Sequence, residues 1–251
     1  MRIRPVPPYQ ALAAIYDQLM MHVDYPMWAD YTRELWRRHG GGRLGSAFDA
    51  ACGTGRFLAA LKEPRLRLAG ADGCAAMLEQ ARRRLPRTVA LSCQDLRELA
   101  MPGRWDLVTC LYDSLNYLEE TDDLRSALAR LGALVAPRGL LVFDVCTERN
   151  SLSHFNDRQE SGRAEEVTWE RHSWYDRPAR LHHNEFLLED EQGRRWAEAH
   201  RQRIYAIEEV EAVAAEAGLS LLGRYADFTL LPGSEQADRV HFAARPTGSQ
   251  V

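Results

Sequence analysis

The sequence predicts an α/β fold: a doubly wound, mostly parallel sheet of seven strands with a C-terminal β-hairpin, plus a small inserted antiparallel β-sheet. Two observations predict it. Short apolar runs alternate with helical segments between residues 47 and 145, which is typical of parallel strands joined by crossover helices. Between residues 167 and 205, polar and apolar residues alternate, which is typical of antiparallel strands with one face in water. The 251 residues fit one such domain with a small addition.

Each element of the main sheet follows from its local pattern. Five parallel strands are expected where short apolar runs occur, at residues 47–51, 66–71, 89–93, 105–111 and 139–145. The helices that connect them are expected at residues 56–61, 75–84 and 122–134. A last amphipathic helix at residues 207–217 ends at Gly218, a normal helix stop. Strands at residues 221–228 and 239–244 follow, and the short loop between them predicts a hairpin.

Two further segments flank and interrupt this pattern. Residues 9–39 are expected to be helical, with breaks near Pro26 and Gly40. The inserted sheet is expected to contain three strands, at residues 167–174, 181–189 and 196–205.

Composition disfavours several classes of partner and compartment. The net charge of −4 disfavours a nucleic-acid partner, and the basic run at residues 82–84 is expected to be a solvated helix end. No apolar run approaches the length that crosses a bilayer, so no membrane partner is expected. The five cysteines form no Cys-x-x-Cys pair, and the N-terminus shows no secretory signal. We therefore expect a cytoplasmic protein.

The residues that follow the first strand indicate a cofactor loop. Gly53 and Gly55 allow a tight turn close to a ligand, at the strand end where open parallel sheets bind ligands. A dinucleotide loop would carry Gly or Ala where Leu58 stands, and its pyrophosphate would be repelled by Asp49. A carboxylate there favours a positively charged cofactor instead. S-adenosylmethionine (SAM) fits, because its methionine part carries an ammonium and a sulfonium.

Polar residues at the following strand ends extend this site. Asp72 stands 19 positions after Gly53, where an acidic residue receives the two ribose hydroxyls of an adenosine cofactor. Gly73 follows it, and Met77 can cover the adenine. After the third strand, the carboxylate of Asp95 can accept from the adenine amino group. The remaining members of the expected cofactor site are Ala51 and Gly55 in the first loop, Gln94 and Leu96 after the third strand, and Leu111 and Tyr112 after the fourth.

These segments resemble the motifs of class I SAM-dependent methyltransferases. Residues 49–55 are similar to the first motif, with Ala51 in place of a usual glycine. Residues 70–72 with Met77 are similar to the second, and Gln94-Asp95 to the third. The resemblance implies a Rossmann-like fold, SAM as methyl donor and S-adenosylhomocysteine as product.

A looser resemblance points to a bacterial subgroup that includes amino-sugar and glycine N-methyltransferases and carries an inserted antiparallel sheet. It rests on residues 16–20, 113–117 and 143–145. It implies that Tyr16 contacts the SAM carboxylate, whereas a core aromatic is the alternative for this residue. The expected organisation is an N-terminal helical cap at 1–40, a SAM-binding domain at 41–147 and 206–246, and an inserted antiparallel sheet at 148–205 acting as a substrate lid.

The sequence leaves the methyl acceptor open. The catalytic candidates facing it are Tyr112, Asn116, His200 and Arg203, with Asp113 beside them. A base role is possible for a histidine of the inserted sheet, whereas their spacing does not support a metal site. An amine acceptor needs only to arrive neutral, while a hydroxyl acceptor would need a general base.

We expect methyl transfer to N (or O) of a small molecule by in-line displacement. The alternatives are a SAM-binding regulatory protein without turnover, or an RNA or protein methyltransferase. The Asn/Asp-Pro-Pro-Phe/Tyr motif of many base and protein methylators is missing after the fourth strand. The aromatic residues between 25 and 36 are expected to form a lid more readily than a dimer surface, which leaves a monomer or a homodimer open.

Overall fold

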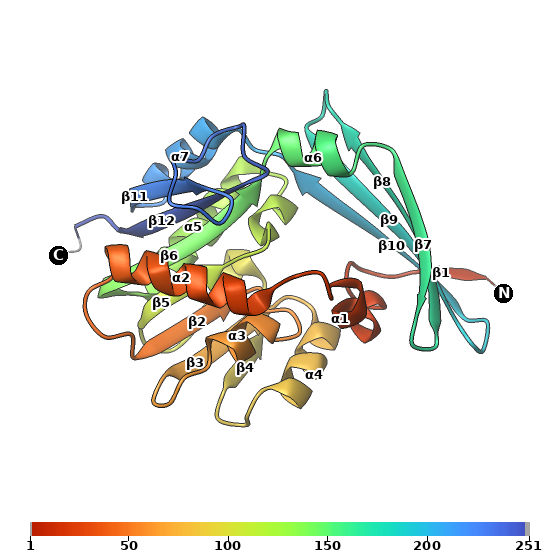
Figure 1. The fold of residues 1–251 in the computed structure, drawn as a ribbon, viewed down its shortest axis with the longest axis horizontal. Coiled ribbons are helices and arrows are strands. Elements are labelled where there is room, and N and C mark those ends of the chain that lie inside the picture. The colour runs from red at the N-terminus through yellow and green to blue at the C-terminus, as the bar shows by residue number, and fades with distance from the viewer. Residues whose placement is uncertain (1, 249–251) are drawn as a thin grey trace.

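The computed structural model describes residues 2–248 and contains two separate sheets. Figure 1 shows that the sheets lie nearest to each other around the helix labelled α6 and diverge from there. The large sheet has seven strands in the order β11-β12-β6-β5-β2-β3-β4. Its strands in chain order are β2 (Ser46–Ala50), β3 (Arg67–Asp72), β4 (Ala90–Cys93), β5 (Trp105–Cys110), β6 (Val135–Cys146), β11 (Leu219–Ala226) and β12 (Arg239–Pro246).

The pairing of these strands confirms the expected fold class. Strands β4, β3, β2, β5 and β6 run parallel, and β12 and β11 add an antiparallel hairpin at the β6 edge. Strand β6 begins earlier than residue 139, because Val135 already pairs with Trp105.

Helices cover both faces of the large sheet. On one face, α5 (Thr121–Leu134) and α7 (Ile207–Glu216) share an apolar cluster with β5, β6 and β12. On the other face lie α2 (Tyr25–His39), α3 (Arg56–Leu61) and α4 (Ala75–Arg84). The expected double winding is therefore present, and both faces of the sheet are dry.

The small sheet has five strands, two more than the alternation alone indicated. Its order is β1-β10-β9-β8-β7, and its strands are β1 (Ile3–Pro5), β7 (Arg158–Ala164), β8 (Val167–Asp176), β9 (Leu181–Asp190) and β10 (Arg195–Arg203). Strand β1 comes from the other end of the chain and pairs parallel with β10. A short helix α6 (Glu148–His154) connects the large sheet to β7.

The segment before residue 40 crosses from the small sheet to the large one. After β1 come a 3₁₀ helix η1 (Leu12–Ala14), the single turn α1 (Tyr16–Leu19) and α2. Figure 1 shows α1 between the two sheets. On α2, Trp28, Tyr31, Leu35 and Trp36 pack against the large sheet. The segment 1–40 therefore contributes a strand as well as helices.

Two further 3₁₀ turns, η2 (Leu96–Glu98) and η3 (Ser114–Tyr117), follow β4 and β5 at the carboxyl edge of the large sheet. Among residues 2–248, no helix is both long enough and apolar enough to span a bilayer.

Candidate active site

The loop after β2 turns sharply because three of its residues adopt left-handed backbone conformations. The φ angles are 59° at Ala51, 54° at Gly53 and 77° at Gly55. The loop is closed by the backbone N–H of Cys52, which donates to Ala71 at 2.8 Å, and by that of Gly53, which donates to Asp72 at 2.8 Å. Hydrogen bonds to the end of β3 therefore fix the loop that follows β2.

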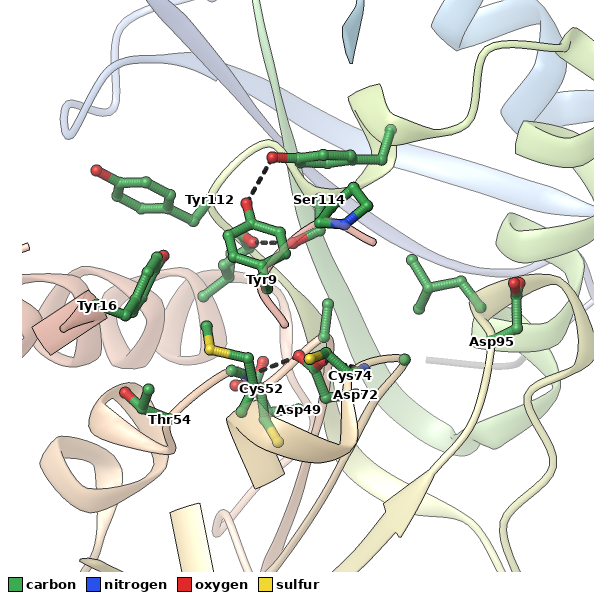
Figure 2. Close-up of a pocket in the computed structure, with 18 of the residues that line it drawn as sticks. Tyr9, Tyr16, Asp49, Cys52, Thr54, Asp72, Cys74, Asp95, Tyr112 and Ser114 are labelled. Carbon is green, nitrogen blue, oxygen red and sulfur yellow. Dashed lines mark hydrogen bonds between the residues drawn. The ribbon is translucent and has the colours of Figure 1, made fainter. Parts of the chain in front are cut away.

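This loop forms the floor of a cavity of about 820 Å³, which we call the first cavity. All residues of the expected cofactor site line it except Gly55 and Gln94. Figure 2 shows Asp49 and Asp72 side by side beneath Tyr9, Tyr16 and Tyr112, with Asp95 at the far end. The structure thus brings together strand ends that are separated by tens of residues in the chain.

Asp49 is the most deeply buried acid of this cavity. Its side chain lies at the end of β2 in a residue that is 3% exposed, and it accepts a hydrogen bond from the hydroxyl of Thr109 at 2.6 Å. Burial raises the pKa of Asp49 to about 7, although the Thr109 hydrogen bond opposes the shift. A cation placed beside Asp49 would stabilise the ionised form.

Asp72 is held by the backbone at the end of β3. Its two carboxylate oxygens accept N–H bonds from Gly53 and Cys74, both at 2.8 Å. Burial raises the pKa of Asp72, and these two N–H donors oppose the rise. The carboxylate is therefore fixed in orientation, and each of its oxygens keeps a lone pair for a further donor.

Asp95 ends the first cavity on the side of β4. It caps the 3₁₀ turn η2 by accepting from the backbone N–H of Arg97 at 2.8 Å. The guanidinium of Arg97 also pairs with Asp95, at 2.7 Å, and with Asp123, at 3.1 Å. Its hydrogen bonds lower the pKa of Asp95 and keep the carboxylate an acceptor.

Two residues of the expected cofactor site face elsewhere. A Cβ added at Gly55 would lie 2.8 Å from the Leu85 side chain, so this glycine serves the packing of α3 on α4. Gln94 uses its amide in hydrogen bonds to Ser92, at 2.6 Å, and to the backbone of Ala100, at 2.9 Å. Neither residue lines the first cavity.

A second cavity of about 760 Å³ lies between the inner face of the small sheet and the large sheet. Four tyrosines line both cavities, so the two spaces adjoin at this point: Tyr9, Tyr16, Tyr112 and Tyr117. Figure 2 shows Tyr9, Tyr16 and Tyr112 projecting into one space. The wall formed by the small sheet carries Trp169, Arg171, Phe186 and His200.

The loop after β5 is strained and is held by an ionic cluster. Tyr112 and Asp113 have φ angles of 64° and 52°, and their backbone N–H groups donate to Asp144 at 3.1 and 2.7 Å. Arg239 bridges Asp113, at 2.7 Å, and Asp144, at 3.0 Å. Its guanidinium also lies 5.0 Å from the centre of the Tyr112 ring. The cluster fixes Tyr112 between the two cavities.

Asn116 and Arg203 line neither cavity. Asn116 is fully buried; its side chain donates to the Arg203 carbonyl at 2.7 Å and accepts from the backbone N–H of Cys146 at 3.0 Å. The Arg203 guanidinium pairs with Glu209 at 2.6 Å. Asn116 therefore joins the small sheet to β6 of the large one, and Arg203 joins the small sheet to α7. His200 and Tyr112, the other two catalytic candidates, do line the second cavity.

Three residues around His200 escaped the sequence analysis. Tyr117 and Glu198 are hydrogen-bonded to His200, and Tyr9 is hydrogen-bonded to Tyr117; the two tyrosines line both cavities, whereas Glu198 lies behind His200. One signal was available for Glu198: on a strand, positions 198 and 200 share a face, whereas 200 and 203 do not.

Arg84, expected to be solvated, instead fastens the N-terminal segment to the cofactor loop. Its guanidinium pairs with Asp17 and donates to the Thr54 carbonyl. Thr54 in turn donates its hydroxyl to Asp17 at 2.7 Å. The turn α1 is thereby held over the first cavity.

Known proteins are similar to this chain in sequence and in fold. A family described as a methyltransferase domain matches residues 47–139. The putative methyltransferase YqeM of Bacillus subtilis (strain 168) is 30% identical over 249 residues, covering 97% of this chain and 99% of that protein. The dTDP-3-amino-3,6-dideoxy-alpha-D-glucopyranose N,N-dimethyltransferase of Streptomyces fradiae is 37% identical over 121 residues, covering 46% of this chain and 47% of that enzyme.

A solved structure of an S-adenosylmethionine-dependent methyltransferase from Clostridium acetobutylicum ATCC 824 has the same fold. It superposes with a TM-score of 0.79 at 24% identity, covering 96% of this chain and 99% of the other. Sequence, cofactor loop and fold agree, so the chain belongs to the class I S-adenosylmethionine-dependent methyltransferases and SAM is its methyl donor.

Proposed function

We propose that this enzyme methylates an amine nitrogen of a small molecule held in the second cavity. The observation that carries the proposal is the junction of the two cavities at the four tyrosines. A volume of about 760 Å³ lies in the range of small-molecule sites. The amino-sugar N,N-dimethyltransferase that matches half of the chain supports nitrogen as the acceptor atom.

The residues of the first cavity fit SAM. Asp49 offers a buried carboxylate to the positively charged methionine part, and Asp72 has oriented lone pairs for the ribose hydroxyls. Gly53 leaves its cavity side open, since a Cβ there would first meet Met77 at 3.5 Å. We propose that Asp95 and Leu96 receive the adenine, and that Tyr16 receives the SAM carboxylate.

Bound SAM supplies a methyl group on a positively charged sulfur, which the acceptor nitrogen attacks in line as S-adenosylhomocysteine leaves. The chain contributes alignment and exclusion of water. Proximity and orientation can supply roughly 7–11 kcal/mol in favourable cases. We propose that Tyr112, fixed by the Asp113–Asp144–Arg239 cluster, separates donor from acceptor and sets the approach of the nitrogen. The small sheet acts as the lid, and its strands β7, β8, β9 and β10 line the second cavity.

The experiment is a comparison of initial methyl-transfer rates from SAM to amines and to phenols. The amine panel contains glycine and the dTDP-3-amino-3,6-dideoxyglucose used by the Streptomyces relative, and the phenol panel contains matched hydroxyl compounds. We expect transfer to members of the amine panel. Transfer to phenols alone would replace the proposal by O-methylation.

The five free cysteines lead us to propose that the enzyme works in the reducing cytoplasm.

A further inference from the structure

A chain of hydrogen bonds leads from the junction of the two cavities into the small sheet. The hydroxyls of Tyr9 and Tyr117 are 2.6 Å apart, and the Tyr117 hydroxyl is 2.9 Å from Nδ1 of His200. Nε2 of His200 lies 3.1 Å from a carboxylate oxygen of Glu198. Both tyrosines line both cavities, whereas His200 and Glu198 are 3% and 0% exposed. The chain therefore connects the reaction space to a buried acid–base pair.

The partners of Glu198 fix the direction of this chain. Three backbone N–H groups point at its carboxylate, from Tyr9 at 2.7 Å, Ala11 at 2.5 Å and Leu12 at 2.9 Å. The carboxylate is thus an acceptor, and Nε2 of His200 carries the hydrogen that it receives. Nδ1 is then free to accept from Tyr117, and Tyr117 accepts from Tyr9. All donors point away from the cavities, so the chain is set to carry a proton inward.

The imidazole of His200 lies beside two aromatic rings and has Glu198 as its ionisable partner. The ring of Tyr9 stands edge-on to the imidazole at 4.8 Å, and the ring of Phe186 lies 5.4 Å away. Glu198 is the ionisable partner of the imidazole, and Asp72, Asp113 and Arg171 are the charged groups that act on the neighbouring tyrosines. Burial raises the pKa of the Tyr9 and Tyr117 hydroxyls, so both stay protonated at neutral pH. They can pass a proton on but do not act as bases.

We propose that Tyr9, Tyr117, His200 and Glu198 form a relay that removes a proton from the acceptor, so that the enzyme accepts a basic aliphatic amine in its protonated form. This inference rests on the proposed N-methylation. An ammonium has no lone pair for the methyl group, so one N–H proton must leave before transfer. An aromatic amine is already neutral at physiological pH and would not require such a relay.

The proton balance of the step is as follows. The ammonium N–H bond breaks and its proton joins the Tyr9 oxygen, while the Tyr9 hydroxyl proton moves to Tyr117. The Tyr117 proton moves to Nδ1 of His200, which becomes an imidazolium beside the Glu198 carboxylate. Both tyrosines end neutral, and the amine nitrogen keeps the electron pair that it needs. Tyr9 receives the proton from the acceptor and Tyr117 passes it on, and the pair of His200, at the wall of the second cavity, and the buried Glu198 holds it.

The experiment measures the pH dependence of kcat/KM for the best amine of the panel in wild type, Tyr117→Phe and His200→Gln. Both variants should lose about 100-fold at pH 7. The loss should shrink as the pH approaches the pKa of the amine, because neutral amine then arrives from solution. Tyr117→Phe removes one oxygen and tests the relay even if His200→Gln folds poorly. Calorimetric affinity for S-adenosylhomocysteine should stay within about twofold of wild type.

Two control variants remove a tyrosine hydroxyl and a histidine ring from the small sheet, outside the relay. Tyr175→Phe removes a hydroxyl that donates to Glu148 at 3.1 Å, and His183→Gln removes a ring that stacks on Trp174 at 4.7 Å. Neither residue lines the first or second cavity, so both variants should keep the wild-type pH profile.

A second readout does not depend on turnover. With S-adenosylhomocysteine and the amine bound, NMR should show an imidazolium at His200 in wild type and a neutral ring in Tyr117→Phe. A loss of rate that is equal at every pH, or a His200 ring that stays neutral in the wild-type complex, would overturn the relay while leaving N-methylation standing. Absence of transfer to every amine in wild type would instead remove the proposed function itself.

Discussion

The two sheets turn different kinds of side chain inward. Every residue of β2 is buried, and the cluster around β5, β6 and β12 is apolar. On β10 of the small sheet, the buried positions are instead polar and alternate with exposed ones: Glu198, His200 and Gln202. The large sheet is a hydrophobic core whose strand ends line the first cavity. The small sheet is a polar wall whose inner face itself lines the second cavity.

This difference teaches where specificity resides. A dry sheet buries its side chains and leaves only the loops at its edge free for chemistry. On the inner face of the small sheet, several buried polar side chains instead hydrogen-bond to one another, as where Asn184 accepts from Ser173 at 2.6 Å and from Arg171 at 2.5 Å. On the proposed function, substitutions on the small sheet should therefore change acceptor recognition without loss of donor binding at the large sheet.

The first prediction compares a buried leucine in each sheet. Leu141 on β6 and Leu188 on β9 are 0% and 1% exposed, but Leu188 belongs to a much smaller apolar cluster. Leu141→Ala should lower the free energy of unfolding by about 4 kcal/mol and Leu188→Ala by about 2 kcal/mol. Denaturant titration of both variants measures the difference. Equal losses would show that the small sheet is packed as tightly as the large one.

The second prediction concerns donor binding. Asp72→Ala removes a carboxylate that we expect to accept two ribose hydroxyls, and should weaken SAM binding by about 100-fold or more. The matched control is Asp106→Ala, which removes a carboxylate bonded to the backbone of Gly45 and Ser46, each at 2.9 Å. This control should lower stability and leave SAM affinity unchanged in calorimetric titration. An affinity loss of similar size in both variants would contradict the assignment of Asp72.

The third prediction uses the pKa of about 7 at Asp49. The ionised fraction of such a group falls about tenfold between pH 8 and pH 6, so the ratio of SAM affinities of wild type to Asp49→Asn should fall by about the same factor. The pKa of Asp49 rises from 3.8 to about 7 on folding, so the folded protein holds this proton more tightly than the unfolded chain. The stability that this proton contributes is lost as the pH rises from about 4 to about 7. The Tm of ligand-free wild type should therefore fall relative to that of Asp49→Asn across this pH window. A pH-independent affinity ratio would contradict a role for the Asp49 charge.

The smallest expected effect concerns the contact between the N-terminal segment and the cofactor loop. Arg84 and Asp17 form a partly exposed ion pair, with side chains 30% and 32% exposed, and such pairs contribute little. Arg84→Met should raise the KM for SAM by about threefold. Arg83→Met is the control, because Arg83 is exposed and makes no side-chain hydrogen bond among residues 2–248. Equal KM values for the two variants would show that α1 needs no such fastening.

The contrast between the sheets also explains what the sequence could predict. Asp49, Gly53, Asp72 and Asp95 line the first cavity as expected, because each follows a strand whose carboxyl end must reach the same edge. Gln94 was placed there for the same reason, but its amide completes the turn before Ala100. Local spacing therefore locates a loop and does not settle which of two neighbouring side chains faces the ligand.

The second cavity depends on pairings that no local pattern reveals. Strand β1 pairs with β10, nearly two hundred residues along the chain, and Glu198 binds the backbone of residues 9–12. Asn116 and Arg203 look like site residues in the sequence, but Asn116 links the two sheets and Arg203 links the small sheet to α7. Polar residues on an alternating strand are compatible both with solvent and with a polar cavity, and only the tertiary contacts distinguish the two.

The most direct test of the account is a single-turnover reaction with SAM carrying a ¹³C-methyl group, stoichiometric with wild-type enzyme, across the amine panel. The account predicts that S-adenosylhomocysteine and one N-methylated amine appear in equal amounts, detected by mass spectrometry and NMR. SAM that binds tightly yet stays intact with every amine would contradict it and would favour a SAM-binding protein without turnover.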